Sequence, residues 1–241
     1  MKTIKAMGAL LLFFVSTFTH AIEHQSCEIK HNNVAIDITN EYYITVLCNK
    51  AYTSYYSDLD RIPYLVTENV TRSNLSQKEP RTNDFRPDLR LPPKLRSTLK
   101  DYYRSGYDRG HMAPAGDTND HETISESFLL SNMTPQNPEL NRTLWKNIEN
   151  YARIKANLNG QAFVITGATF NHCLVEEKLH DRVSVPDKYF KIILSGGKID
   201  AFLVDNVHPK SIKINEYRTD LKTINEKLCG IRIKVERGIK F

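Results

Sequence analysis

Four consecutive residues near the middle of the chain carry groups that could act on a phosphate or on water. They are Asp108, Arg109, Gly110 and His111. A histidine with an ordinary pKa of about 6.5 can accept a proton from water near neutral pH. An arginine can neutralise a phosphate through paired hydrogen bonds. A simpler interpretation also fits, in which His111 is an ordinary packed residue and Asp108 and Arg109 form a surface ion pair.

A second polar stretch leads into a predicted helix. Asn137 followed by Pro138 is typical of a helix cap and its first turn, and apolar residues then keep helical spacing up to Gly160. Four other residues recur at every fourth position, which places them along one stripe of the helix. They are Asn141, Trp145, Glu149 and Arg153. Taken alone, this stripe also fits a solvated face with one half-buried tryptophan.

Together these features resemble the sugar-non-specific DNA/RNA endonucleases, which carry a ββα-metal active site. Three motifs agree in order over residues 108–153: Asp-Arg-Gly-His, Asn-x-Thr-Pro-Gln and Asn-x-x-x-Trp-x-x-x-Glu. The resemblance implies hydrolysis of phosphodiester bonds in DNA and RNA without strong sequence specificity, giving 5′-phosphate ends. It also implies dependence on Mg²⁺.

The resemblance assigns roles to particular residues. His111 corresponds to the general base, Asn141 to the only direct protein ligand of one Mg²⁺, and Glu149 to the residue that holds the metal through water. The motif asparagine corresponds to Asn132 and the helix arginine to Arg153.

A further arginine of the family contacts phosphate upstream of these motifs. Arg81 is the best match, and Arg86 is a nearby alternative.

The chemistry of these residues agrees with the assignment. Asn141 and Glu149 are eight residues apart, about 12 Å along a regular helix, so both can hardly contact one ion directly. Mg²⁺ prefers oxygen ligands and retains waters, so one amide suffices when an outer carboxylate holds those waters. Mn²⁺ shares this preference and could substitute. Asp108 would orient a metal-bound water or support the loop, while Arg109 and Arg153 would neutralise phosphate oxygens.

The N-terminus has the pattern of a secretory signal peptide. Lys2 and Lys5 precede an apolar run over residues 6–18, and a small residue, Ala21, ends the segment. A membrane anchor is the rival interpretation, but the run is shorter than the roughly 20 apolar residues that span a bilayer. We therefore expect removal of residues 1–21, a domain over residues 22–241 in a periplasm or outside the cell, and no stable membrane association.

The four cysteines all follow this segment. An even count in an exported chain favours disulfides, and four cysteines allow three pairings. Cys27–Cys48 and Cys173–Cys229 are favoured because each pair brackets one local segment. Free buried thiols are the alternative, whereas a zinc site has less support because no Cys-x-x-Cys spacing occurs.

Hydrophobic periodicity predicts a single α+β domain with a largely antiparallel sheet flanked by helices. Strands outnumber helices and do not alternate regularly with them. The pattern predicts a hairpin of residues 34–38 and 42–47, and strands over 50–56, 64–68, 161–166, 188–194 and 199–204. It predicts helices over 137–160 and 217–228, and a long surface connection over 69–106 with a helix near 93–103.

That connection is rich in basic residues. From Lys78 to Arg109 there are nine Lys or Arg against five Asp or Glu, which indicates either a rim that follows phosphates or a solvated loop. Tyr102, Tyr103 and Tyr107 could stack on bases, although packing is the commoner role for such tyrosines.

Composition limits the other classes of function. The 241 residues are 40% hydrophobic and 25% charged with net charge +5, which excludes a collagen-like or a disordered chain. G-x-S-x-G and H-E-x-x-H are both absent, so serine hydrolases and zincins lack support. The alternatives are a phosphodiesterase of restricted substrate range and a non-catalytic nucleic-acid-binding protein. The sequence determines neither oligomeric state nor preference between DNA and RNA.

Overall fold

The computed structural model describes residue 27 and residues 34–39, 43–76 and 79–236. The predicted signal peptide, residues 1–21, lies outside the described residues. Among the described helices, none combines the length and apolar character needed to cross a membrane.

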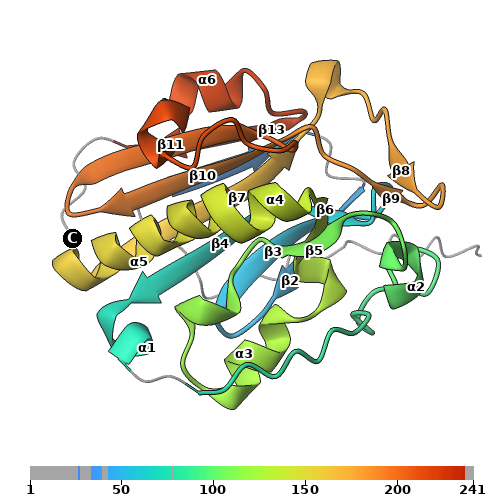
Figure 1. Cartoon of the computed structure of the whole chain (residues 1–241), viewed down its shortest axis with the longest axis horizontal. Coiled ribbons are helices and arrows are strands. Elements are labelled where there is room, and N and C mark those ends of the chain that lie inside the picture. Colours follow the sequence, from blue (N-terminus) through green and yellow to red (C-terminus); the bar gives the residue numbers. More distant parts are fainter. Residues whose placement is uncertain (1–26, 28–33, 40–42, 77–78, 237–241) are drawn as a thin grey trace, which may run out of the picture.

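A seven-stranded sheet forms the centre of the molecule, in the order β12-β11-β10-β7-β4-β3-β2 (Figure 1). All neighbouring strands pair antiparallel, which confirms the predicted sheet. The five strands that were predicted outside the hairpin are all present. The bounds are β2 Ile44–Cys48, β3 Tyr52–Ser57, β4 Ile62–Thr71, β7 Gln161–Thr169, β10 Lys188–Ser195, β11 Lys198–Asp205 and β12 Arg218–Thr219.

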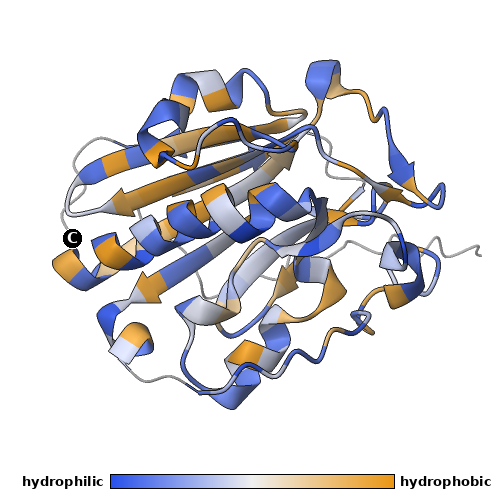
Figure 2. Cartoon of the chain, viewed as in Figure 1, coloured by the Kyte–Doolittle hydropathy of each residue, from blue (hydrophilic) through white to orange (hydrophobic). Residues whose placement is uncertain are grey.

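The two faces of the sheet are covered differently. Successive side chains of a strand point to opposite faces, so Val164 packs toward a long helix while Ile165 packs toward a second layer of strands. Apolar residues are concentrated on the central strands between these layers (Figure 2). The second layer consists of β1 Val34–Ile38, β13 Ile231–Val235 and the short helix α6 Leu221–Asn225.

The predicted hairpin of residues 34–38 and 42–47 is wrong. β1 pairs with β13 at the other end of the chain, and β2 pairs with β3. In the β1–β13 pair Ile36 lies opposite Ile233 and Ile38 opposite Ile231. These apolar side chains cover the sheet face opposite the long helix. Burial of that face, and not the turn after residue 38, determines the partner.

The long helix of the site has three consecutive parts: α4 Pro138–Leu140, a π-helical segment Asn141–Trp145, and α5 Lys146–Asn159. The Asn137 side chain accepts hydrogen bonds from the amides of Glu139 and Leu140 at 3.0 and 3.2 Å, as predicted for the cap. Gly160 ends the helix with φ 90°, a conformation that glycine adopts without strain.

Two short strands lie at the beginning of this helix. β5 Asp108–His111 pairs antiparallel with β6 Met133–Gln136, so that His111 lies opposite Met133. The carbonyl of Pro135, at the exit of β6, accepts hydrogen bonds from Tyr189 at 2.7 Å and from Asn206 at 3.0 Å. The central sheet thereby holds the strand pair and the helix in one orientation.

The C-terminal helix is shorter than the predicted range of residues 217–228. Tyr217 ends a 3-10 turn and packs on the side of the sheet that carries α5, whereas Leu221 and Leu228 pack on the opposite side. The chain crosses the sheet edge as β12 between Tyr217 and Leu221. The apolar residues have helical spacing, but they pack on opposite faces of the sheet and do not form one helix over the whole range.

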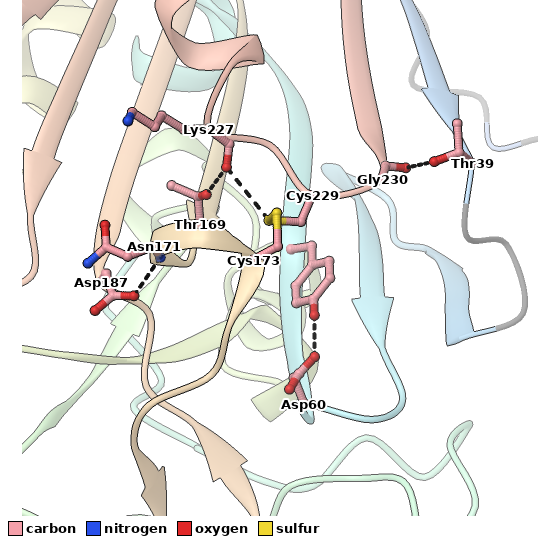
Figure 3. Close-up of a disulfide and its surroundings, with 10 residues drawn as sticks. Thr39, Asp60, Thr169, Asn171, Cys173, Asp187, Lys227, Cys229 and Gly230 are labelled. Carbon is pink, nitrogen blue, oxygen red and sulfur yellow. Dashed lines mark hydrogen bonds between the residues drawn. A yellow bond between two sulfur atoms is a disulfide. The ribbon is translucent and has the colours of Figure 1, made fainter.

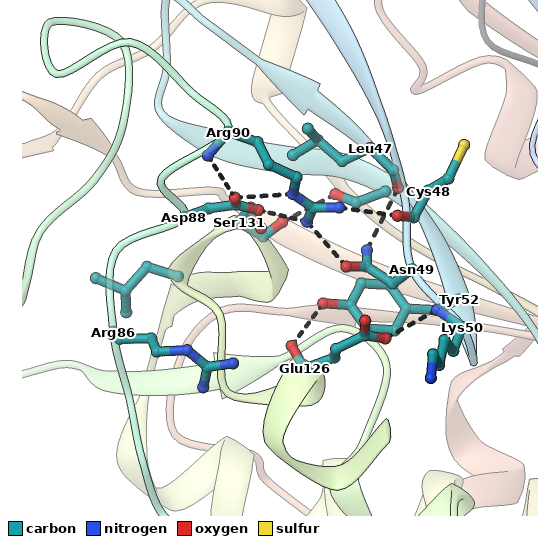
Figure 4. Close-up of polar contacts among 12 residues, drawn as sticks. Leu47, Cys48, Asn49, Lys50, Tyr52, Arg86, Asp88, Arg90, Glu126 and Ser131 are labelled. Atoms are coloured by element: carbon teal, nitrogen blue, oxygen red, sulfur yellow. Dashed lines mark hydrogen bonds and ion pairs between the residues drawn. The ribbon is translucent and has the colours of Figure 1, made fainter. Parts of the chain in front are cut away.

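The connection over residues 69–106 is anchored at several points. It contains α1 Arg72–Ser76 and α2 Leu99–Tyr102, and α2 is shorter than the predicted helix. Buried Asp88 accepts hydrogen bonds from Arg90 Nη2 and from Ser131 Oγ, each at 2.6 Å. Arg90 also donates to the carbonyl of Cys48 at 2.8 Å (Figure 4). These bonds fasten the middle of the connection to the edge of the sheet.

Both predicted disulfides are present and no described cysteine is free. Cys27–Cys48 joins the N-terminal segment to β2, with Cα atoms 5.3 Å apart. Cys173–Cys229 joins the turn after β7 to the turn before β13 (Figure 3). The remaining short elements are α3 His121–Ser127, β8 Lys178–Leu179, β9 Val183–Ser184 and 3-10 turns at Ala115–Asp117, Leu130–Asn132, Asn171–Cys173 and Ile214–Tyr217.

Candidate active site

A cavity of about 340 Å³ lies between the end of β5 and the long helix. Five of the residues predicted from sequence line it, together with residues 114–116, Arg142 and Lys146. The five are Arg81, His111, Asn141, Glu149 and Arg153. The tertiary structure therefore brings together residues that are up to 72 positions apart in the chain.

His111 projects from the end of β5 between two aromatic rings. Its ring centroid lies 5.0 Å from that of Phe128, edge to face, and 5.7 Å from that of Phe85. Its Nε2 is buried and has no hydrogen-bond partner among the described residues. Burial, reinforced by the charges of Arg81 and Arg109, lowers the pKa of His111 to about 3. The imidazole is therefore neutral at physiological pH and carries an uncommitted nitrogen.

Asn141 lies at the start of the π-helical segment, where the helix is locally wider; such segments are frequent at functional sites. Its Nδ2 donates to Asp108 Oδ2 at 2.9 Å. Asp108 also accepts two hydrogen bonds from Arg142, at 2.9 and 2.7 Å. Because the amide nitrogen is used by Asp108, the carbonyl oxygen of Asn141 is the atom left for a cation. Asp108 thus holds the Asn141 side chain, a contact that the sequence analysis did not predict.

Glu149 and Arg153 lie one turn apart farther along the helix. Arg153 Nη2 is 3.7 Å from Glu149 Oε2, and the same guanidinium forms an ion pair with buried Asp117. Burial raises the pKa of Glu149 to about 7, with Lys191 and Arg153 acting in the opposite direction. Arg153 is therefore engaged in holding two carboxylates, and is less available to phosphate than the sequence suggested.

Sequence reasoning missed a group of buried charges beneath the cavity. Lys191 on β10 is 1% exposed, donates to Thr166 and lies 5.2 Å above the Trp145 ring. Glu68 on β4 is 3% exposed, and burial raises its pKa well above the usual value. The available signal was a lysine between the apolar residues of β10 and a glutamate within β4.

Trp145 is fully buried, so the predicted stripe of four residues is divided. It is 1% exposed and packs against Tyr189 at a ring-centroid distance of 5.5 Å. Asn141, Glu149 and Arg153 line the cavity, while Trp145 forms its support. The interpretation of a solvated face with a half-buried tryptophan is wrong.

Asn132 does not line the cavity. It is fully buried, and its amide forms a closed pair of hydrogen bonds with the backbone of Ala113, at 2.9 and 2.8 Å, two residues after His111. A third bond reaches the carbonyl of Ser127 at 2.8 Å. Asn132 was predicted as a catalytic residue, and its contacts here are those of a residue that positions the chain after the histidine.

Gly110, between Arg109 and His111, is explained by a close approach of the paired strand. A Cβ atom at this position would lie 2.7 Å from Gln136 Cβ, and real Cβ atoms do not come so close. The glycine of the motif is therefore a requirement of the β5–β6 pairing.

The basic stretch divides into paired and unpaired arginines. Arg86 pairs with Asp84 at 2.6 Å, and Arg90 pairs with Asp88. Arg81 lies 5.2 Å from the Phe128 ring and Arg109 4.1 Å from the Phe85 ring, and neither has an ion-pair partner within the described part of the chain.

Arg81, and not the alternative Arg86, thus lies at the cavity. Of the three tyrosines, Tyr102 is buried, Tyr107 donates to Glu177 at 2.9 Å, and Tyr103 is 64% exposed. Packing therefore accounts for Tyr102.

The cavity offers oxygen donors to a cation. Across residues 27, 34–39, 43–76 and 79–236, no three His, Cys, Asp or Glu side chains are arranged to hold a metal ion. An amide oxygen from Asn141, in a cavity that Glu149 also lines, instead suits a hydrated hard cation with few direct protein ligands. The residues present fit such an ion.

Two antiparallel strands followed by a helix, with a histidine on the first strand and an asparagine on the helix, define the ββα-metal class of nuclease. The chain matches the DNA/RNA non-specific endonuclease family over residues 31–238, and it belongs to that family. It is accordingly a metal-dependent endonuclease that hydrolyses nucleic acid.

Individual relatives agree with this assignment. A nuclease of Syncephalastrum racemosum is 29% identical over 264 residues, covering 93% of this chain and 82% of the relative. The mitochondrial nuclease EXOG of Xenopus laevis is 31% identical over 77% of this chain, which spans 58% of that protein. A crystal structure of the EndoG/EndoGI complex matches with a TM-score of 0.70 and 27% identity, over 76% of this chain and 82% of that one.

Proposed function

We propose that the protein is an exported, Mg²⁺-dependent endonuclease that cleaves DNA and RNA without strong sequence specificity. One observation carries the proposal: an unpaired, neutral His111 shares a cavity with Asn141, whose amide nitrogen is held by Asp108. Hydrolysis of a phosphodiester needs a base for water, positive charge on the phosphate and stabilisation of the leaving oxygen. The cavity supplies the first two from its own side chains.

His111 is the proposed general base, because its imidazole lines the cavity beside Asn141. A phosphate between Arg81 and Arg109 would offset the two positive charges that, after burial, lower the pKa of His111. Substrate binding would therefore strengthen the base at the moment it is needed. Both arginines carry guanidinium groups free of carboxylate partners within the described residues, and these suit phosphate oxygens.

Asn141 would hold the ion directly through its carbonyl oxygen, and Glu149 would hold it through water. When bound, Mg²⁺ would stabilise the leaving 3′-oxygen and orient the phosphate. Mn²⁺ would substitute for it because both ions favour oxygen ligands. Asp108 and Asn132 are positioning residues in this scheme, since they hold Asn141 and the chain after His111. Arg153 keeps Glu149 and Asp117 in place.

The test is cleavage of supercoiled plasmid and of a structured RNA by purified protein, with Mg²⁺ and with excess EDTA. We expect nicking and then linearisation of the plasmid, degradation of the RNA, and 5′-phosphate products that a phosphatase can modify. Full cleavage in excess EDTA, or cleavage of only one of the two substrates, would contradict the proposal. The second result would favour a phosphodiesterase of restricted range.

Export is supported by the N-terminal pattern and by the two disulfides, which persist in oxidising compartments. Expression of the full chain in a bacterium with a periplasm tests it. We expect a mature protein that begins at residue 22 in the periplasm or medium. A cytoplasmic protein that keeps residues 1–21 would refute it.

A further inference from the structure

A second, larger hollow of about 670 Å³ adjoins the active-site cavity. The two share four lining residues: Arg81, Ala115, Gly116 and Arg153. The two hollows are therefore adjacent, and these four shared residues lie where they meet. Its volume lies within the range of about 300–1,000 Å³ that is usual for small-ligand sites.

The outer hollow differs in chemistry from the catalytic part. Leu75 of α1 and Ile154 of α5 line it, and Ile154 is 54% exposed, so an apolar surface is open to a ligand. Three amide side chains also line it: Asn74, Asn150 and Asn157. Asn150 Oδ1 accepts from Arg153 Nη2 at 2.9 Å, which leaves its NH₂ group to donate.

Charge in the hollow does not favour phosphate. Arg153 is engaged by Asp117 and Glu149, and Glu79 adds a carboxylate to the lining. Arg81, which has no ion-pair partner in the described segments, lies where the two parts join. A phosphate therefore belongs at the junction, and an uncharged planar group belongs beyond it.

We propose that this hollow holds the nucleobase of a nucleotide next to the cleaved phosphodiester. The base packs against Ile154 and Leu75, and the surrounding amides contact its edge or the sugar. An amide both donates and accepts hydrogen bonds, so three of them accommodate any of the bases, as a non-specific enzyme requires. This inference rests on the proposed function, and it specifies which surface beyond the catalytic cavity the substrate strand follows.

The experiment removes one base from the substrate and, separately, the apolar side chain of Ile154 from the protein, and compares the two effects. End-labelled single-stranded decadeoxynucleotides, each with one abasic residue at a different position, are digested with Mg²⁺ and the cleavage rate at each bond is measured. Wild type, Ile154→Ser and Leu158→Ser are compared. Leu158 is the matched control, because it is 70% exposed one turn farther along α5 and does not line the hollow.

In wild type we expect the cleavage rate to fall roughly tenfold at one bond, at a fixed distance from the abasic residue. Loss of the contacts to one base commonly has an effect of that size. Ile154→Ser should cleave the intact oligonucleotide more slowly and show no dip, whereas Leu158→Ser should keep the dip. Thermal unfolding of the two variants checks that both are folded.

Absence of a dip in wild type, or an equal dip in Ile154→Ser, would overturn the inference while leaving the proposed function intact. Failure of wild type to cleave any oligonucleotide with Mg²⁺ would overturn both. The two failures are therefore distinguishable.

Discussion

The Asp88–Arg90 cluster and the His111 cavity are built from the same kinds of side chain, and both connect the basic stretch to the rest of the fold. In the cluster, Asp88 accepts hydrogen bonds from Arg90 and Ser131, and Arg90 also bonds the backbone of Cys48. In the cavity, His111 Nε2 is buried without a hydrogen-bond partner in the described part of the chain, and Arg81 there lacks an ion-pair partner.

This difference separates structural polar residues from reactive ones. Buried polar groups are normally paired because an unpaired group loses its hydration without replacement. The Asp88–Arg90 cluster obeys this rule and fastens a long connection to the sheet edge. The cavity leaves His111 and Arg81 available to substrate, whereas Asp108 pairs with Asn141 and Arg153 pairs with Glu149.

The largest expected effect is the loss of the base. His111→Ala should lower turnover at saturating substrate and Mg²⁺ by about 10²–10⁴-fold, because general-base catalysis contributes about that much. His121→Ala is the control, since His121 is exposed at the start of α3 and should remain active. Near-wild-type turnover of the His111 variant would remove the base from the mechanism.

Loss of the residue that orients Asn141 should have the next largest effect. Asp108→Ala frees the Asn141 amide, so the Mg²⁺ concentration for half-maximal activity should rise by about 10–100-fold, as for other partners of metal ligands. Excess Mg²⁺ should restore part of the activity. Asp205→Ala, which removes an exposed ion pair with Lys188, is the control. An unchanged Mg²⁺ dependence would contradict the role assigned to Asp108.

In the paired cluster the expected effect is on stability and not on chemistry. Asp88→Ala leaves Arg90 and Ser131 without their shared acceptor and should cost about 2 kcal/mol of unfolding free energy, as for hydrogen bonds to charged groups. Denaturant unfolding measures this cost. Activity per folded molecule should stay near wild type at low temperature. A large fall in activity without a loss of stability would place the cluster in the active site.

The smallest effect concerns the pH dependence of stability. The folded pKa of His111, about 3, lies below the unfolded value of about 6.5, so the unfolded chain binds the proton first as pH falls. The contribution of neutral His111 to the unfolding free energy is complete above pH about 6.5 and is lost progressively as the pH falls toward 3. Between pH 7.5 and 5.5 in EDTA, wild type should lose about 1 kcal/mol more unfolding free energy than His111→Gln. Parallel losses would show that the unpaired imidazole does not resist protonation.

The sequence alone was sufficient where the signal is local. Asn137, Pro138 and Gly160 mark the ends of the long helix because caps and breakers act within a few residues. Short runs of mostly apolar residues located the central strands for the same reason. Both disulfides followed from the order of the cysteines and the segments they bracket.

Long-range pairing was decided by the tertiary structure. β1 joins β13, nearly 200 residues away, because both must cover one apolar face of the sheet, and nothing near residue 38 encodes that partner. The tertiary structure also decided which arginine lies at the cavity. Arg86 forms an ion pair with Asp84, whereas Arg81 lines the cavity. Motif residues can be recognised from their types and spacing. Their division into reactive and supporting groups depends on burial and pairing, which arise only when distant segments pack together.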